Sequence, residues 1–498
     1  MKLNAEFVAR TESLFGVERY SRFEAALSSD PVVSVRYNRT KCSEIPEAAE
    51  PVAWASDAYY LDSRPVFTAD PLFHAGCYYV QEASSMFLEQ ALRQYVTEPV
   101  RALDLCAAPG GKSTHLLSLL PKGSMLVANE PMPQRAQVLA ENIIKWGNPS
   151  AVVTMNEPSA FSPFKGFFDF MLVDAPCSGE GMFRKDSFAV EQWTPSNVRA
   201  CAKTQREILS DIWGSLRTGG LLVYSTCTFN REEDEDCVEW IVNELGAEVL
   251  PVETDESWGI TGELTGCGYP VYRFIPGYTR GEGFFLALLR KTDESAVAKM
   301  RLPRQQPLPA KVRAEVEKWL LAPDEFEYIL WEDRVTALPR SHAEAMCALI
   351  AKMKVLHVAQ PLATLKNNKL LPLHTLAMST QLAGGVFTTV ELEREDALRY
   401  LHRETLTLSG APLGVLLLTY KEKPLGFAKN VGNRANNLYP AEWRIRKNPL
   451  ELLNTKIYEK VSIDDYADIL STSLCADVQS CGVQSNNHSR WRPGGNYL

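Results

Sequence analysis

The sequence contains no apolar stretch long enough to cross a membrane. A spanning helix needs about 20 predominantly apolar residues, whereas the longest apolar runs, such as the segment from Leu413 to Leu418, have the length of a strand. The opening residues are polar and charged throughout and lack the apolar core of a secretory signal. We therefore expect a cytoplasmic protein with no membrane partner.

Closely spaced cysteine pairs are also missing. The 11 cysteines are scattered, and none forms a Cys-x-x-Cys motif with another. This spacing argues against a zinc site and against the disulfide framework of a small secreted domain. We therefore expect no metal ion, and most of these cysteines should be buried thiols.

The chain has no excess of positive charge. Its 52 Lys and Arg residues are outnumbered by 61 Asp and Glu residues, which gives a formal net charge of -9. This balance excludes histone-like binding of nucleic acid through bulk charge, so any such contact must use a local basic surface. The length of 498 residues and the hydrophobic content of 45% are those of a globular protein with several domains.

From Arg101 onward, strand-like segments alternate with amphipathic helical segments. The strand-like segments are RALDLC (101–106), SMLVANE (124–130), AVVTMN (151–156), FDFMLVDAP (168–176), GGLLVYSTCT (219–228) and GFFLALLR (283–290). Such alternation predicts an α/β fold in which helices cover both faces of a parallel, doubly wound sheet.

Composition and pattern divide the chain into six predicted regions. The linker is charged and contains proline, and the tail is rich in Ser, Asn and Gly without an apolar period. The regions are a small α+β module (1–90), the α/β domain (91–292), a linker (293–312), an intermediate domain (313–380), a β-rich domain (381–448) and a partly disordered tail (449–498).

A turn of small residues follows the first strand of the α/β region. In "RALDLCAAPGGKSTHLLSLL" an apolar strand leads through this turn into a helix that begins near Lys112. Small residues let a ligand approach the backbone and the helix N-terminus. The turn is not a P-loop, because Cys106 stands where the first glycine is required, and no G-x-G-x-x-G is present.

The next strand ends in Glu130, which lies 19 residues beyond Gly111. Nucleoside-binding α/β domains place a carboxylate at this position to accept hydrogen bonds from ribose hydroxyls. The turn and Glu130 together predict a site for an adenosine-containing ligand without a pyrophosphate.

Two later strands end in reactive side chains. The first is followed by Asp174, Pro176 and Cys177, and the second by Cys227. Ligands of an open parallel sheet bind beyond the carboxyl ends of its strands, so we expect these side chains and the glycine turn to face the same crevice.

Two thiols and a carboxyl group suit methyl transfer to carbon 5 of cytosine. This carbon is a poor nucleophile, but a thiolate that adds to carbon 6 turns the ring into an enamine able to attack the sulfonium methyl of S-adenosylmethionine. Asp174 can hydrogen-bond or protonate ring nitrogen 3 during the addition. A second cysteine can assist the release of the methylated base.

Five segments in this order, "YYVQEASSM", "LDLCAAPGGKSTHL", "DAPCSGEGMFRKD", "YSTCTFNREEDED" and "RFIPGYTRGEGFFLALL", resemble the NOL1/NOP2/Sun family of RNA cytosine-5 methyltransferases. The resemblance extends, more weakly, through a PUA-like C-terminal domain typical of the bacterial members that act on small-subunit ribosomal RNA. It implies a Rossmann-like, S-adenosylmethionine-dependent catalytic domain, flanked by RNA-binding modules at 1–90 and 381–448.

The resemblance also implies roles for individual residues. Cys227 is the expected nucleophile and Cys177 the residue that aids product release, although DNA cytosine methyltransferases use a Pro-Cys turn, so the spacing alone leaves this assignment open. Asn156, where the family usually has Asp, would lie near the adenine. The cofactor pocket would be lined by Cys106, Ala107, Ala108, Pro109, Gly110, Gly111, Lys112, Glu130 and Asp174, with Arg135 nearby.

The C-terminal region has a local basic segment. From Lys421 to Lys447 there are seven basic residues and two acidic ones, a balance that suits phosphate binding. Tyr439 and Trp443 lie in this segment as candidates for base stacking. We interpret the acidic run between Glu232 and Glu239 as structural, since carboxylates favour a helix N-terminus.

Several alternatives stay open. The substrate could be transfer RNA rather than ribosomal RNA, and the chain could be an inert RNA-binding assembly factor that retains the fold. A nicotinamide oxidoreductase is disfavoured by the missing glycine spacing, and a redox pair of Cys177 and Cys227 by the absence of a Cys-x-x-Cys motif. We expect a monomer that binds RNA and not DNA.

Overall fold

A computed structural model describes residues 3–43, 50–294, 308–367 and 369–454 of the chain. Most of the predicted linker and of the predicted disordered tail lies outside these residues. The first residues assigned to the tail form a short helix, α14 (Pro449–Asn454). None of the helices in the described part combines the length and apolar character that crossing a membrane requires.

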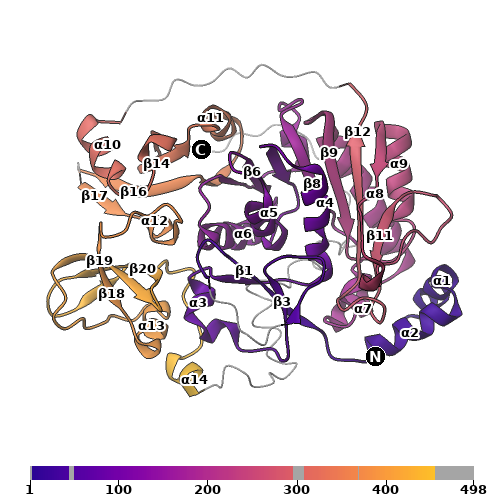
Figure 1. The fold of residues 1–498 in the computed structure, drawn as a ribbon, viewed down its shortest axis with the longest axis horizontal. Coiled ribbons are helices and arrows are strands. Elements are labelled where there is room, and N and C mark those ends of the chain that lie inside the picture. Colours follow the sequence, from indigo (N-terminus) through magenta and orange to yellow (C-terminus); the bar gives the residue numbers. More distant parts are fainter. Residues whose placement is uncertain (1–2, 44–49, 295–307, 368, 455–498) are drawn as a thin grey trace, which may run out of the picture.

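One large sheet forms the centre of the molecule (Figure 1). Its strands are β5 (Arg101–Asp104), β6 (Met125–Asn129), β7 (Ala151–Thr154), β8 (Phe168–Asp174), β9 (Leu216–Thr226), β10 (Ala247–Leu250), β11 (Val271–Phe274), β12 (Phe284–Lys291) and β15 (Val355–Val358). They are ordered β10-β12-β9-β8-β5-β6-β7-β15, with β11 paired to β12. The five strands from β9 to β7 are parallel, which confirms the predicted Rossmann-like fold.

Helices cover both faces of this sheet. On one face lie α4 (Leu88–Tyr95), α5 (Gly111–Leu119) and α6 (Pro133–Trp146), and on the other α8 (Pro195–Trp213), α9 (Glu235–Leu245) and α11 (Ala343–Lys352). The neighbours Leu126 and Val127 on β6 are both fully buried but belong to opposite core clusters. Side chains alternate across a strand, so a strand buried on both faces appears in the sequence as a continuous apolar run.

The N-terminal module combines helices and a small sheet, as predicted. Its elements are α1 (Ala5–Phe15), α2 (Val17–Leu27), α3 (Pro71–His74) and the strands β1 (Val33–Tyr37), β2 (Glu50–Pro51), β3 (Ala58–Leu61) and β4 (Tyr78–Val80). The rings of Phe23 and Phe229 lie 5.1 Å apart, and those of Phe7 and Phe183 lie 5.0 Å apart. The helix pair therefore packs against the loops that follow β8 and β9.

The predicted intermediate domain is only partly separate from the catalytic sheet. It contains α10 (Ala310–Glu317), α12 (His374–Met378) and a sheet of β13 (Phe326–Trp331), β14 (Arg334–Pro339), β16 (Gln360–Lys366) and β17 (Lys369–Pro372). Strand β15 instead pairs antiparallel with β7. The division at 313–380 is wrong in this respect, because β15 satisfies the backbone groups that β7 would otherwise leave unpaired at the sheet edge.

The C-terminal β-rich region forms one four-stranded sheet. Its strands are β18 (Thr388–Glu391), β19 (Gly414–Tyr420), β20 (Lys423–Asn430) and β21 (Ala435–Asn437), with α13 (Arg394–Leu401) and the short helix α14 packed beside them. The segment 405–410 (TLTLSG) contributes only a bridge between Leu406 and Ala435 to this sheet. Gly410, with φ near 79°, turns the chain shortly after it.

Candidate functional site

The predicted site residues converge at the carboxyl edge of the central sheet. The turn after β5, Glu130 after β6, Asp174 at the end of β8 and Cys227 after β9 all lie at this edge. The chain order reverses between β5 and β8, and such a switch point forms the ligand crevice of an open α/β sheet. The strand order thus places these residues where open α/β sheets bind their ligands.

Two sulfur atoms meet at this edge. Cys177 Sγ lies 2.9 Å from Cys227 Sγ, and the backbone N–H of Cys227 donates to Cys177 Sγ at 3.3 Å. Both residues are partly exposed. The hydrogen bond with Cys227, followed by burial, raises the pKa of the Cys177 thiol well above its usual range. Cys177 thus keeps its proton and can donate it in a hydrogen bond to Cys227.

A lysine and a carboxylate stand beside the sulfurs. Lys112 Nζ lies 2.7 Å from Asp174 Oδ2, while Ser225 Oγ donates to Asp174 Oδ1 at 2.6 Å. Burial opposes a charge on Lys112, but the Asp174 carboxylate and the nearby Cys227 raise the pKa of Lys112 above its ordinary value. Sequence reasoning placed Lys112 only in the cofactor turn, whereas the structure also makes it the cation nearest to this acid.

Two side chains of α6 hold the turn from Cys106 to Lys112. Asn142 Nδ2 donates to the carbonyl of Pro109 at 2.8 Å, and Arg135 Nη2 donates to that of Ala108 at 3.2 Å. Gly110 has a φ of 116°, and an added Cβ would lie 3.3 Å from Asn142 Cβ. The turn is thus close-packed on one side and needs glycine at this position.

Glu130 is almost completely buried, with 2% of its surface exposed. Its Oε1 accepts from the backbone N–H of Met132 at 2.9 Å, and its Oε2 lies 3.5 Å from Arg135 Nη1. These contacts fix the carboxylate at the end of β6 and place Arg135 beside it.

Two polar residues at this edge were missed by sequence reasoning. Asn129 Nδ2 donates to the carbonyls of Leu105 and Asn156, and Asn129 Oδ1 accepts from Thr154 Oγ1, so one side chain links three strand ends. Asp104 Oδ2 accepts from Ser113 Oγ at 2.6 Å, but the buried Oδ1 has no hydrogen-bond partner within the described residues.

Burial raises the pKa of Asp104 to about 7, although the Ser113 hydrogen bond opposes the rise. A buried carboxylate oxygen without a partner, next to a close-packed glycine turn, is suited to a cationic group of a ligand. S-adenosylmethionine carries such groups, an ammonium and a sulfonium, and its ribose would find an acceptor in Glu130. The residues present therefore fit this cofactor.

The side chain of Asn156, which the family resemblance places near the adenine, is already hydrogen-bonded within the protein. Its side-chain amide donates to the carbonyl of Lys354 at 3.0 Å, and its side-chain oxygen accepts from the N–H of Lys354 at 3.1 Å. Asn156 thus ties the end of β7 to the chain segment that enters β15, and its contact with adenine stays a prediction.

A buried network joins the two cysteine loops. Glu180 Oε2 accepts from Thr228 Oγ1 at 2.6 Å and from Phe229 N at 2.7 Å, and Glu233 Oε2 accepts from Ser178 N at 3.0 Å. Within the acidic run, Asp234 and Glu235 pair with the buried Arg273. The acidic run is structural, as interpreted from the sequence. Its members Asp234 and Glu235, however, form buried ion pairs and are not exposed to solvent.

The basic C-terminal segment differs from prediction at one residue. Tyr439 is 1% exposed and packs against His374 and Tyr400, so it is not available for stacking on a base. Its neighbours in the core are apolar and aromatic side chains, which the sequence pattern did not indicate. Trp443 is partly exposed and remains a stacking candidate.

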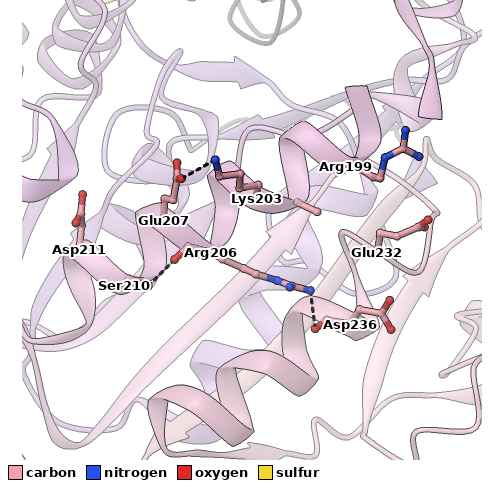
Figure 2. A pocket seen from close by; sticks show the side chains of 9 residues that line it. Arg199, Lys203, Arg206, Glu207, Ser210, Asp211, Glu232 and Asp236 are labelled. Carbon is pink, nitrogen blue, oxygen red and sulfur yellow. Dashed lines mark hydrogen bonds and ion pairs between the residues drawn. The ribbon is translucent and has the colours of Figure 1, made fainter. Parts of the chain in front are cut away.

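A surface hollow of about 580 Å³ lies apart from this site, between α8 and the start of α9. Figure 2 shows Lys203 directed toward Glu207 and Arg206 directed toward the backbone of Asp236. None of the predicted site residues lines this hollow, and its carboxylates Glu207, Glu232 and Asp236 are each paired with a basic residue.

Family models match three parts of the chain. They describe the 16S rRNA methyltransferase RsmB/F over residues 93–290, the N-terminal domain of 16S rRNA methyltransferase RsmF over residues 3–83 and the methyltransferase RsmF PUA domain over residues 387–445. The matches follow the order of the predicted N-terminal, catalytic and C-terminal regions.

Similar proteins carry related names. Ribosomal RNA small subunit methyltransferase F of Klebsiella pneumoniae (strain 342) is 32% identical over 413 residues, covering 79% of this chain and 84% of that protein. Its namesake in Escherichia coli O157:H7 is 30% identical over 415 residues, with the same coverages of 79% and 84%. The solved structure of a methyltransferase homolog protein from Pyrococcus horikoshii has a TM-score of 0.50 and 28% identity, covering 58% of this chain and 95% of that one.

Proposed function

Because this chain belongs to the RsmB/F family of 16S rRNA methyltransferases, which use S-adenosylmethionine, we propose that it methylates carbon 5 of a cytosine in 16S rRNA through a covalent adduct with Cys227. The observation that carries the proposal is the contact of Cys227 Sγ with Cys177 Sγ beside the Lys112–Asp174 pair. A methyltransferase acting on an oxygen or an exocyclic nitrogen has no use for two thiols at its cleft.

The proposed reaction begins when the Cys227 thiolate adds to carbon 6 of the cytosine. The electron pair of the 5,6 double bond then becomes available at carbon 5. When bound, S-adenosylmethionine supplies an electrophilic methyl group. After methyl transfer, water takes the proton from carbon 5, and the electron pair of that C–H bond re-forms the 5,6 double bond while the Cys227 sulfur leaves carbon 6 as a thiolate. The S–H of Cys177 can stabilise this departing thiolate.

Lys112 and Asp174 can balance the negative charge that the addition places on the ring. Both oxygens of Asp174 are held by donors, Lys112 Nζ and Ser225 Oγ, so its orientation is fixed before substrate binds. Preorganised charge in a partly buried cleft stabilises a developing charge better than solvent does. We propose that Lys112 and Asp174 together, rather than Asp174 alone, balance this charge on the side of the ring that carries nitrogen 3.

A direct assay tests the proposal. The purified protein is incubated with S-adenosylmethionine and 16S rRNA, as naked transcript and as assembled small subunit, and the digested RNA is analysed by mass spectrometry. We expect 5-methylcytidine in at least one of the two substrates. Methylation at any other atom, or of transfer RNA alone, would contradict it.

Replacing Glu130 with alanine should weaken S-adenosylmethionine binding by about 1 to 3 kcal/mol, because ribose hydroxyls would lose a buried acceptor. Isothermal titration calorimetry measures the change. Glu157→Ala, at an exposed carboxylate after the next strand, is the matched control and should bind like the wild type. Equal affinities for the two variants would remove Glu130 from the cofactor site.

Cofactor binding should release protons near pH 7. Since the pKa of Asp104 is about 7 in the folded protein, a bound cation would favour the ionised carboxylate and lower this pKa. Affinity should therefore rise with pH, by up to about tenfold per unit below pH 7, and level off above it. Calorimetry in buffers of different ionisation enthalpy counts the protons, and Asp104→Asn should abolish the release.

A further inference from the structure

A pocket of about 340 Å³ lies where the catalytic and C-terminal parts of the chain meet. We name it the junction pocket. Its wall comes from α6, from the hairpin of β13 and β14, from β15 and from the segment after β21. The lining residues are Gln137, Ala140, Glu141, Ile144, Trp331, Glu332, Arg334, Val355, Leu356 and Trp443.

Two tryptophans from distant parts of the sequence line the junction pocket. Trp331 ends β13 and Trp443 follows β21, and both indoles are partly exposed. Each has a cation nearby, with Arg334 Cζ 5.7 Å from the Trp331 ring centroid and Lys145 Nζ 5.6 Å from that of Trp443. Partly exposed aromatic rings with adjacent cations are the usual platforms on which unpaired bases stack.

The charges around the pocket suit a nucleotide. Glu141 and Glu332 bring carboxylates to its wall, where Glu141 pairs with Lys145 and Glu332 with Arg334. Each ionised carboxylate has further lone pairs, which can accept hydrogen bonds from base amino groups. Two exposed cations, Lys354 and Arg444, directly neighbour lining residues in the chain and can reach phosphates. The pocket thus joins stacking surfaces to hydrogen-bond acceptors and phosphate-binding cations.

The junction pocket also lies toward the carboxyl edge of the central sheet, as the proposed catalytic residues do. Val355, which lines it, is paired with Thr154 at the carboxyl end of β7, and the preceding Lys354 is bonded to Asn156. This is the edge at which the thiols lie. Five strand spacings of about 4.8 Å separate β15 from β9, so the pocket is about 24 Å from the Cys227 strand along the sheet. A single RNA strand can span this distance with a few nucleotides.

We propose that the junction pocket binds an unstacked base of the same RNA whose target cytosine reaches Cys227. The inference rests on the proposed function, because it takes RNA as the substrate. Binding a second base at a fixed distance from the thiols would position the strand and contribute to the choice of cytosine. A protein component of the ribosomal subunit is the competing occupant, and the experiment below separates the two.

The test compares Trp331→Ala and Trp443→Ala with Trp240→Ala. Trp240 is likewise partly exposed and has a cation nearby, with Arg206 Cζ 5.9 Å from its ring, but it lies on α9 outside the pocket. We expect each pocket variant to bind naked 16S rRNA about five- to 150-fold more weakly, as loss of one stacked base predicts, and Trp240→Ala to bind normally. Fluorescence anisotropy with labelled RNA measures the affinity.

Further measurements separate stacking from folding and from catalysis. Trp331→Phe and Trp443→Phe should recover most of the affinity, and RNA containing 4-thiouridine should crosslink to peptides that contain Trp331 or Trp443. S-adenosylmethionine affinity should stay unchanged in all variants. Normal binding of naked RNA by both alanine variants, or a defect limited to assembled subunits, would overturn the proposal. Wild-type protein that methylates no RNA would instead overturn the proposed function, and the inference with it.

Discussion

Replacing Cys227 with serine should abolish methyl transfer, with a loss of at least about four orders of magnitude in rate. A serine hydroxyl is almost entirely protonated at neutral pH and is a far weaker nucleophile than a thiolate, so addition to carbon 6 would fail. The wild type should form a denaturation-stable adduct with RNA that carries 5-fluorocytidine at the target, because fluorine cannot leave as a proton does. The variant should form none, as gel electrophoresis under denaturing conditions will show.

The assay needs a thiol reductant, because the Cys177 and Cys227 sulfurs are in contact and an oxidant would join them. Cys201→Ser serves as control, since Cys201 is a buried thiol of α8 and is not one of the two sulfurs in contact. An adduct that persists in Cys227→Ser would assign the nucleophile to another residue.

Replacing Cys177 with serine should have the opposite effect on the covalent species. Release of the base requires a thiolate to depart from carbon 6, and Cys177 is the donor 2.9 Å from that sulfur. The shorter serine side chain withdraws this donor, so adduct should accumulate on ordinary cytosine-containing RNA while turnover falls by about two to four orders of magnitude. Denaturing gels and single-turnover kinetics distinguish accumulation from slow addition.

The division of roles can be rejected by the same measurements. If Cys177→Ser and Cys227→Ser both fail to form adduct with 5-fluorocytidine RNA, the two sulfurs act in one step and the assignment is wrong. If only Cys177→Ser fails, the roles are reversed and the Pro-Cys turn carries the nucleophile.

The position of the thiols could be predicted because each follows a strand of a parallel sheet. Apolar runs identify such strands, and their common direction brings Cys177, Cys227 and Glu130 to one edge. The turn of small residues after the first strand could also be predicted. Small residues between a strand and a helix let a ligand approach the backbone closely. Local pattern and sheet geometry were sufficient for this part of the site.

The rest of the site depends on contacts between distant segments, which no local sequence pattern indicates. Asp104 appears in the sequence as one polar residue in an apolar strand, and only the packing around it shows an oxygen without a partner. Glu180 and Glu233 gain their importance from donors supplied by the other cysteine loop. For Tyr439 the sequence was misleading. Its basic neighbours in the sequence suggested an exposed position, but its ring packs against His374 in the interior.

The pairing of β15 with β7 constrains how this protein can be dissected. A fragment that ends at residue 292, where the sequence suggests a boundary, would leave β7 as an open edge with unsatisfied backbone groups and uncover apolar side chains beneath α11. Such a fragment invites intermolecular strand pairing and aggregation during expression. The methyltransferase unit is therefore complete only when the chain has continued through residue 358.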